Sequence, residues 1–190
     1  MSIVERWFGA GFVQLNPLLQ QLHQQGGKLH GQVDLQLGRG LAGIVGARLA
    51  TRLGIPTEHT RVAFQVDIHG TDDSLHWNRC FADSAMLYSR FQPSGSWPDG
   101  YWLESTGALT LALAVDIRQG GWYWRPLKAW LHGVRIPLWL LPRTEAYKRI
   151  EDGRYHFHVG FSLPLLGNLL SYSGALQLDS ATAESRDHTP

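Results

Sequence analysis

Residues 108–118, ALTLALAVDIR, decide the fold that the sequence predicts. Large apolar side chains alternate with small or polar ones along the segment, and Leu109, Leu111, Leu113, Val115 and Ile117 fall on one face. A period of two is typical of a β-strand with one face in an apolar core. At about 3.4 Å per residue, such a strand would be about 37 Å long.

The same alternation recurs along the chain and predicts about nine or ten strands joined mostly by short turns. The clearest further example is RVAFQVDI at residues 61–68. The other predicted strands are residues 28–37, 75–81, 86–91, 101–105, 122–131, 170–178 and two strands that flank Asp152-Gly153. Asp-Gly is a strong hairpin signal because both residues tolerate positive φ angles.

Two short helices are predicted among these strands. Asn16-Pro17 is a cap and first-turn pair that begins a helix ending at Gly26. Residues 41–53 have apolar side chains every four positions, which indicates an amphipathic helix ending at Gly54.

A mainly β (α+β) fold with a curled or closed antiparallel sheet fits this pattern best. A flat sheet of so many long strands would expose a large apolar face and two unpaired edges, and closure removes both. We therefore expect a lipocalin-like barrel or a sheet that grips a helix, with a two-sheet β-sandwich as the alternative. Residues 1–179 are predicted to form one such domain with N-terminal helical segments, and the polar residues 180–190 a disordered tail.

The amino-acid composition argues against several classes of protein. The 190-residue chain has a formal net charge of +1, which argues against nucleic-acid binding because that needs many phosphate-neutralising side chains. Cys80 is the only cysteine, so no intramolecular disulfide or cysteine metal cage can form. The N-terminus lacks the pattern of a signal peptide, and no apolar run reaches the about 20 residues of a membrane span. We expect a cytoplasmic protein, with peripheral membrane contact as a further expectation.

An ordered series of motifs resembles a known bacterial family. The series comprises Trp77-x-Arg79-x-Phe81, Glu104-x-x-Gly107, Gly120-Gly121, Pro137, Pro142, Glu151-Asp152-Gly153-Arg154-Tyr155-x-Phe157-x-Val159, Pro164-x-x-Gly167 and Tyr172-x-Gly174-x-Leu176. Over residues 12–178 the chain is similar to the domain of unknown function 4166 family. That family also occurs fused behind nucleotide-binding, reductase-like domains, so the resemblance implies a substrate-holding role beside a reductase-type partner. The family name itself implies no activity.

One predicted ligand-binding cluster lies on the strand at residues 75–81. Trp77, Arg79 and Phe81 share a face, so Arg79 could bind a carboxylate or phosphate between two aromatic walls. The structural interpretation, which we favour, pairs Arg79 with Glu104 or Asp116 or stacks it on the rings. Glu104 and Asp116 are also the candidate acids for proton transfer.

Two further motifs lead to no predicted cofactor or metal. His156 and His158 point to one face of a strand, but no third or fourth ligand is evident, so we expect two solvent-facing histidines and no metal. Gly38-x-Gly40-x-x-Gly43 follows a strand and opens a helix, as in a dinucleotide-binding turn. The strands that follow form hairpins rather than a βαβ unit, so we interpret the glycines as a tight turn with close helix packing.

Residues 122–142 combine aromatic and basic side chains. The wider segment 117–154 has eight basic and three acidic residues, a combination that suits a membrane interface or an anionic amphiphile. We predict a hydrophobic cavity with its mouth near residues 133–142, where Trp139 and the ring of Arg125, Arg135 and Arg143 would receive a head group. The alternative is a core strand followed by a loop that plugs one end of the barrel.

The sequence therefore favours a binding module for a hydrophobic or amphipathic, lipid-like small molecule, which would be presented to a reductase-type partner. One alternative is a small enzyme that uses a pocket acid or His156 and His158 for proton transfer or isomerisation. The other is a structural domain that binds a protein partner. No catalytic residue is assigned.

Overall fold

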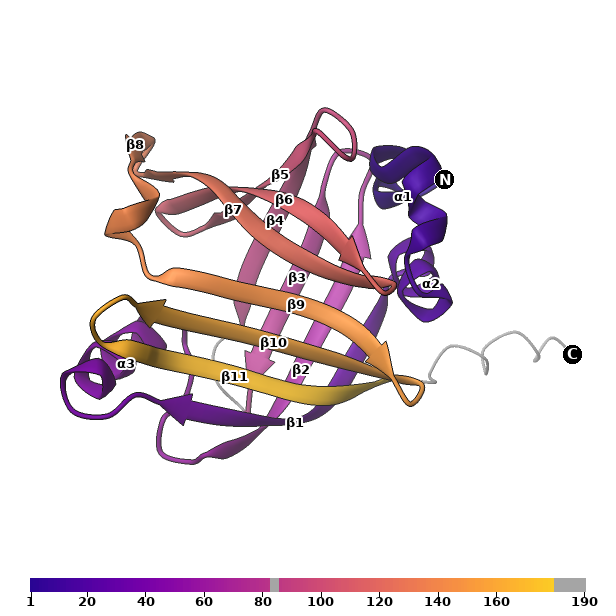
Figure 1. Ribbon diagram of the computed structural model, residues 1–190. Helices are drawn as coiled ribbons and strands as arrows, with labels where there is room; N and C mark the ends of the chain where they lie inside the picture. The colour runs from indigo at the N-terminus through magenta and orange to yellow at the C-terminus, as the bar shows by residue number, and fades with distance from the viewer. Residues whose placement is uncertain (83–85, 180–190) are drawn as a thin grey trace, which may run out of the picture.

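Closure of the sheet defines the architecture. The computed structural model describes residues 1–82 and 86–179, and in this part of the chain ten antiparallel strands close into a barrel (Figure 1). The barrel strands are β1 (Gly27–Leu37), β2 (Arg61–Gly70), β3 (Leu75–Phe81), β4 (Leu87–Ser94), β5 (Tyr101–Thr106), β6 (Leu109–Arg118), β7 (Gly121–Leu131), β9 (Arg143–Glu151), β10 (Arg154–Leu163) and β11 (Gly167–Leu178). The short β8 (Val134–Ile136) pairs with β7 outside this ring.

The strand order confirms the predicted lipocalin-like closed sheet. Neighbours run β6-β5-β4-β3-β2-β1-β11-β10-β9-β7, and the pairing of β6 with β7 completes the ring. Each edge therefore has a hydrogen-bonded partner, which a two-sheet sandwich would not provide. The sandwich alternative is wrong for this chain.

The alternating residues of the decisive segment face the interior as predicted. Leu109, Leu111 and Leu113 of β6 all line the space inside the barrel. A register shift between Ala112 and Leu113 lets this long strand bend as the sheet closes. Across the barrel, Val33 of β1 is fully buried opposite Val62 of β2.

Three N-terminal helical segments close one end of the barrel. They are α1 (Ile3–Phe8), the 3-10 segment η1 (Gly9–Gln14) and α2 (Pro17–Gln25), which begins at the predicted Asn16-Pro17 pair. Trp7 and Phe8 insert among Trp102 and Trp122, with ring centroids 5.2 Å apart for Trp7–Trp102 and 5.0 Å for Phe8–Trp122. The sequence-based prediction missed α1, although Ser2 and Glu5 form a capping box at its start. We call this cluster of helices and aromatic side chains the plug.

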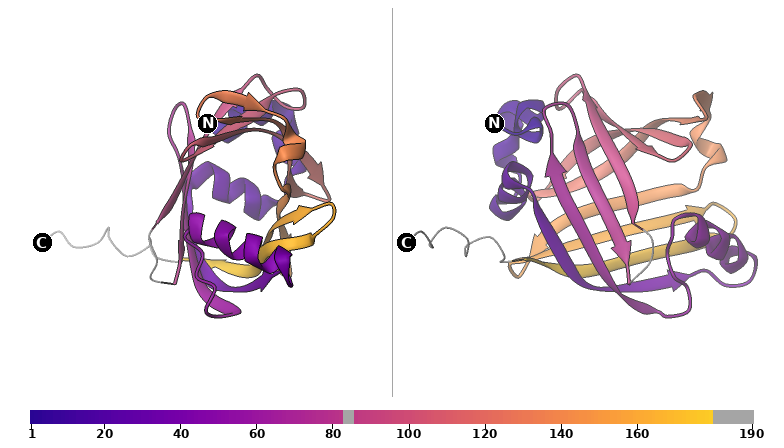
Figure 2. Two further views of the ribbon diagram at one scale, coloured as in Figure 1. Left: turned by 90° about the vertical axis from the view of Figure 1, so that its left-hand side faces the viewer. Right: turned by 180° about the vertical axis from the view of Figure 1, so that it is seen from behind.

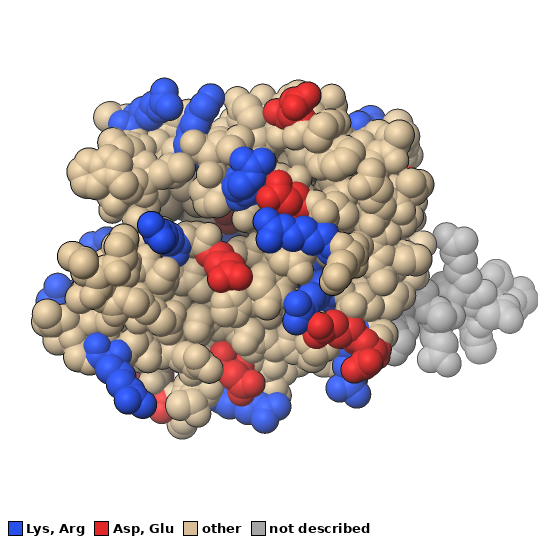
Figure 3. All heavy atoms as spheres, viewed as in Figure 1, with Lys and Arg blue, Asp and Glu red and all other residues tan. Residues whose placement is uncertain are grey.

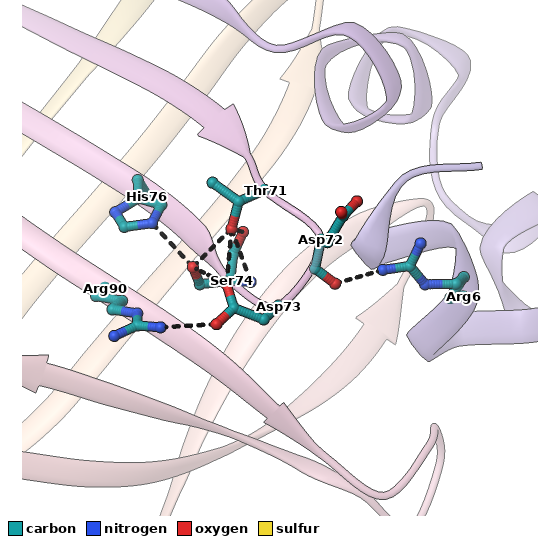
Figure 4. Close-up of polar contacts among 7 residues, drawn as sticks. All are labelled: Arg6, Thr71, Asp72, Asp73, Ser74, His76 and Arg90. Carbon is teal, nitrogen blue, oxygen red and sulfur yellow. Dashed lines mark hydrogen bonds and ion pairs between the residues drawn. The ribbon is translucent and has the colours of Figure 1, made fainter.

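The turn between β2 and β3 attaches the plug to the barrel rim (Figure 4). Arg6 of α1 donates a hydrogen bond of 2.6 Å to the backbone carbonyl of Asp72. Within the turn, Thr71 and Ser74 bond to each other and to Asp73, and Asp73 in turn pairs with Arg90 of β4 at 3.0 Å. The turn is thus held from the helix side and from the strand side.

The helix α3 (Leu41–Arg52) lies at the opposite end and packs on β11. A Cβ atom on Gly46 would come 1.9 Å from the backbone carbonyl oxygen of Leu169, so only glycine permits this close approach. The helix connects β1 to β2, which pair antiparallel, so the Gly38 motif is not part of a βαβ unit.

Other boundaries differ only slightly from the prediction. Residues 133–142, where we predict the mouth of the cavity, contain β8 and the 3-10 turn η2 (Leu138–Leu140). The predicted disordered tail, residues 180–190, lies outside the described residues.

The plug should carry a large share of the stability. Trp102 is fully buried, and Trp102→Ala should lower the free energy of unfolding by about 3–5 kcal/mol in urea titrations. Trp139 is 78% exposed and serves as a matched control, because Trp139→Ala should change that free energy by less than about 0.5 kcal/mol. Equal losses in the two variants would contradict the role of the plug.

Candidate ligand-binding cavity

Between the plug and α3 the barrel encloses a cavity of about 1060 Å³. Its walls are mainly apolar side chains of the inward strand faces, among them Phe64, Val66, Phe91, Leu111, Trp124, Phe157 and Val159. The deep end is bordered by Leu22 of α2 and by Trp77. The predicted hydrophobic cavity is therefore present.

The cavity reaches the surface at the end that carries α3. There it is lined by Val45, Arg48 and Arg52, which are exposed side chains of α3. Residues 131–144 form the other side of the mouth and contribute Leu131, Ile136, Leu138, Pro142 and Arg143. The left-hand view of Figure 2 faces this end, with α3 in front and the orange η2 segment above it.

A polar cluster on the cavity wall surrounds Arg79. Its Nη2 donates to Ser89 Oγ and lies 3.5 Å from Glu104 Oε1, while Ser89 Oγ and Thr106 Oγ1 are 2.9 Å apart. Arg79 and Glu104 are about 15% and 18% exposed, so the pair is shielded from bulk solvent. Burial raises the pKa of the nearby Tyr172 hydroxyl, and the Arg79 charge opposes that rise. Of the partners that the sequence left open for Arg79, Glu104 is the one that this geometry supports, whereas Asp116 pairs with Arg125.

A second polar group lies where the cavity meets the plug. Lys148 of β9 lines the cavity and is 8% exposed. Its Nζ lies 4.1 Å from the ring centre of Trp77 and 4.0 Å from that of Trp122. His23 of α2 is 4% exposed, and its Nε2 lies 2.5 Å from Nζ.

Burial dominates the titration of both bases. It lowers the pKa of Lys148 well below the ordinary 10.5. Burial, and secondarily the Lys148 charge, lowers the pKa of His23 well below 6.5. The neutral forms are favoured because neither base is solvated enough to stabilise a charge.

The predicted site residues fall into three groups. Trp77, Arg79, Glu104 and Arg143 line the cavity. Phe81 packs in the core against Phe64 and Tyr172. Of the remaining predicted residues, Arg125 forms an ion pair with Asp116 on the outside of the barrel at 3.3 Å, and Arg135 and Trp139 are exposed.

Arg125 faces outward because it directly follows Trp124, whose ring lines the cavity. It therefore does not join Arg143 at the mouth, where Arg48 and Arg52 lie instead. The three arginines of the predicted ring, Arg125, Arg135 and Arg143, therefore do not lie together at the mouth.

His156 and His158 also lie on the outer face. Tyr155, Phe157 and Val159, which alternate with the two histidines along β10, pack on the core, so the two imidazoles point away from it. His156 Nδ1 is 3.5 Å from Glu151, and His158 stacks on Tyr147 with centroids 5.5 Å apart. Among residues 1–82 and 86–179, no three histidine, cysteine or acidic side chains are grouped closely enough to hold a metal ion.

The β2–β3 turn brings serine, histidine and aspartate together without forming a catalytic triad. Ser74 Oγ is 2.9 Å from His76 Nε2, but Asp73 accepts a hydrogen bond from Ser74 itself (Figure 4). In a triad the carboxylate orients the histidine, so this arrangement cannot activate the hydroxyl in the same way. The cluster stabilises the turn.

A shallower hollow of about 640 Å³ lies on the outer surface over β1, β11 and β10. Small residues such as Gly31 and Gly174 form its base, and polar side chains including Arg61, Arg154 and His156 surround it. It lies on the outer side of the sheet that walls the cavity.

The fold and the cavity define the class: a closed antiparallel β-barrel with an apolar interior that opens at one end. The chain belongs to the family described as domain of unknown function (DUF4166), which matches residues 15–176. That match runs from just before α2 to residue 176 in β11 and so includes nearly the whole barrel. No curated protein matches the sequence. Among the described residues, no helix is long and apolar enough to cross a membrane.

Lys148 should make the stability of the protein depend on pH. A base whose pKa is lower in the folded than in the unfolded state takes up protons on unfolding, so stability rises with pH and falls on acidification. Lys148→Met should therefore unfold at higher urea concentration than wild type at about pH 7, by about 1–3 kcal/mol. This advantage should shrink as the pH approaches the ordinary lysine pKa of 10.5.

The control for this experiment is Lys128→Met. The Lys128 ammonium lies 5.7 Å from the Tyr101 ring, and the side chain is half-buried, in contrast to the buried Lys148. Its substitution should leave the pH dependence of unfolding unchanged. A Lys148→Met profile parallel to that of wild type would show that Lys148 titrates normally.

Proposed function

We propose that this protein is a binding module for a hydrophobic or amphipathic, lipid-like small molecule held inside the barrel. The observation that carries this proposal is the apolar cavity of about 1060 Å³. Typical small-molecule sites enclose about 300–1000 Å³ and combine apolar walls with a few polar groups. The cavity has this composition and is large enough for an acyl chain.

The charges around the cavity favour a ligand with an anionic group. Its arginine lining residues are Arg48, Arg52, Arg79 and Arg143, and Glu104 is the acidic one among the described residues. Because Glu104 already pairs with Arg79, the arginines at the mouth have no acidic counterpart in the lining. A carboxylate or phosphate at the mouth would supply one.

Filling the cavity should abolish binding. Ala146 of β9 lines the cavity, so Ala146→Phe should weaken binding of a dansyl-labelled undecanoic acid at least about tenfold, equal to about 1.4 kcal/mol, in a fluorescence titration. Ala63→Phe is the matched control, because Ala63 is exposed on the outside of β2. Unchanged affinity in Ala146→Phe, or no binding by wild type, would contradict the proposal.

The ligand in our proposal enters from an anionic membrane surface that the mouth contacts peripherally. Most of the large apolar side chains that are exposed lie at this end: Leu37, Leu41, Ile44, Val45, Leu131, Val134, Leu138, Trp139, Leu140, Leu165 and Leu166. Monomers rarely expose an apolar surface of this extent without a partner. Lys and Arg side chains accompany it (Figure 3), and basic residues beside exposed tryptophan and leucine suit an anionic lipid interface.

Trp139 offers the most direct test of membrane contact. Trp139→Ala should lower the partition coefficient onto phosphatidylserine-containing vesicles about tenfold, or about 1.4 kcal/mol, in co-sedimentation. Val13→Ala is the control, because Val13 is 75% exposed but lies on η1 at the plugged end. Vesicle binding that is absent in wild type, or equally sensitive to Val13→Ala, would refute a contact through the mouth.

A further inference from the structure

Lys148 is the polar group of the cavity whose charge the barrel does not compensate. Arg79, the other buried cation of the wall, has Glu104 beside it. Within the described residues no carboxylate forms an ion pair with Lys148, and its polar neighbour is the neutral ring of His23. Burial without a carboxylate favours the neutral amine of Lys148, whose lone pair is available for reaction.

The surroundings of the amine also position it. Trp77 and Trp122 face it from β3 and β7, at 4.1 and 4.0 Å, while His23 approaches from α2 at 2.5 Å. Lys148 and Trp77 line the cavity, whereas His23 and Trp122 belong to the plug behind it. The amine therefore lies at the boundary between the cavity and the plug, at the deep end.

A purely structural role explains the buried Lys148 less well than a chemical role does. A buried lysine without an anionic partner destabilises a fold, and an apolar side chain of similar length would fill the same space without that cost. Contacts with the indole faces offset part of the cost, but any well-packed side chain would contact them too. Perturbed bases in apolar clefts occur preferentially at sites that use their chemistry.

We propose that Lys148 is a covalent attachment site at which the bound hydrophobic molecule, when it carries an aldehyde or ketone, forms an imine with Nζ. This inference rests on the proposed function, because the carbonyl compound must first enter the cavity. It narrows the proposed ligand to a hydrophobic carbonyl compound whose aldehyde or ketone group lies at the deep end of the cavity.

The step balances without any co-reactant. The Nζ lone pair attacks the carbonyl carbon, and the oxygen takes up the proton that leaves the nitrogen, which gives a carbinolamine. The C–O bond then breaks, a second nitrogen proton leaves with the oxygen as water, and the C=N bond forms. His23 Nε2, in contact with Nζ, is placed to take each proton from nitrogen and return it to oxygen.

The absence of a nearby carboxylate also affects the product. Among the described residues nothing anionic faces Nζ, so the imine nitrogen stays unprotonated in the apolar surroundings. A neutral imine is less electrophilic than a protonated one, and an apolar cavity holds little water to attack it. The linkage is therefore expected to persist while the cavity is occupied.

The test uses dodecanal and its alcohol, dodecanol, as matched probes. Sodium borohydride, added to samples withdrawn at intervals, reduces neutral as well as protonated imines and fixes the adduct as a secondary amine, which peptide mass spectrometry can locate. The chain's lysines are Lys28, Lys128 and Lys148, so each can be followed separately. At about pH 7, Lys148 should be alkylated at least about tenfold faster than the other two, because each unit of pKa lowering raises the neutral fraction about tenfold.

Two variants and the alcohol separate attachment from binding. Lys148→Arg and Lys148→Met should lose the adduct. Dodecanol cannot form an imine, so its binding to the wild-type protein, measured by displacement of the dansyl fatty acid, reports on occupancy of the cavity alone. If dodecanol binds but Lys148 is alkylated no faster than Lys128, the imine proposal is wrong and the binding module stands. If wild type binds neither probe, the proposed function fails and the imine proposal fails with it.

Discussion

The pairing of β6 with β7 is the interaction on which the rest of the structure depends. It joins the two ends of a sheet that would otherwise expose the backbone donors and acceptors of two edge strands. Closure also fixes the size of the interior. About eight strands already enclose the space of one small ligand, so side chains of ten strands do not fill the interior on their own. A plug, a cavity or both must occupy the remainder.

The two ends of the barrel meet this constraint differently. At one end α1 and α2 insert aromatic and leucine side chains among Trp102 and Trp122, and the space is filled. At the other end α3 packs sideways on β11 through Gly46 instead of entering the barrel. The filled end provides stability, and the end left open provides access. At this open end the strands and turns have no plug to pack against, and their apolar side chains therefore stay exposed.

The sequence predicts the barrel well because alternation is a local property. Each strand shows its inward face within a few residues, as β6 and β2 do, and closure follows from the number of strands. The same alternation could have identified Lys148 as a cavity residue, which the sequence-based prediction missed. On β9, Thr144, Ala146 and Ile150 share the inward phase, and Lys148 falls in that phase. Its meeting with His23, 125 positions away, depends on how the plug enters the barrel, which no local pattern encodes. Arg125 was grouped with the mouth by proximity in sequence, although its place beside inward-facing Trp124 implies the outer surface.

The polar groups that remain inside show how the interior differs from a packed core. Arg79 pairs with Glu104, and Ser89 and Thr106 bond within the same cluster across three neighbouring strands, so the cost of burying the Arg79 charge is partly offset within the wall, although Arg79 Nε has no hydrogen-bond partner among the described residues. Lys148 and His23 share one contact, and His23 Nδ1 has no hydrogen-bond partner among the described residues. The barrel thus contains one polar cluster with a carboxylate beside its cation and one without. The cluster without a carboxylate borders the deep end of the cavity, so a polar group on a bound molecule would find there a partner that the protein does not supply.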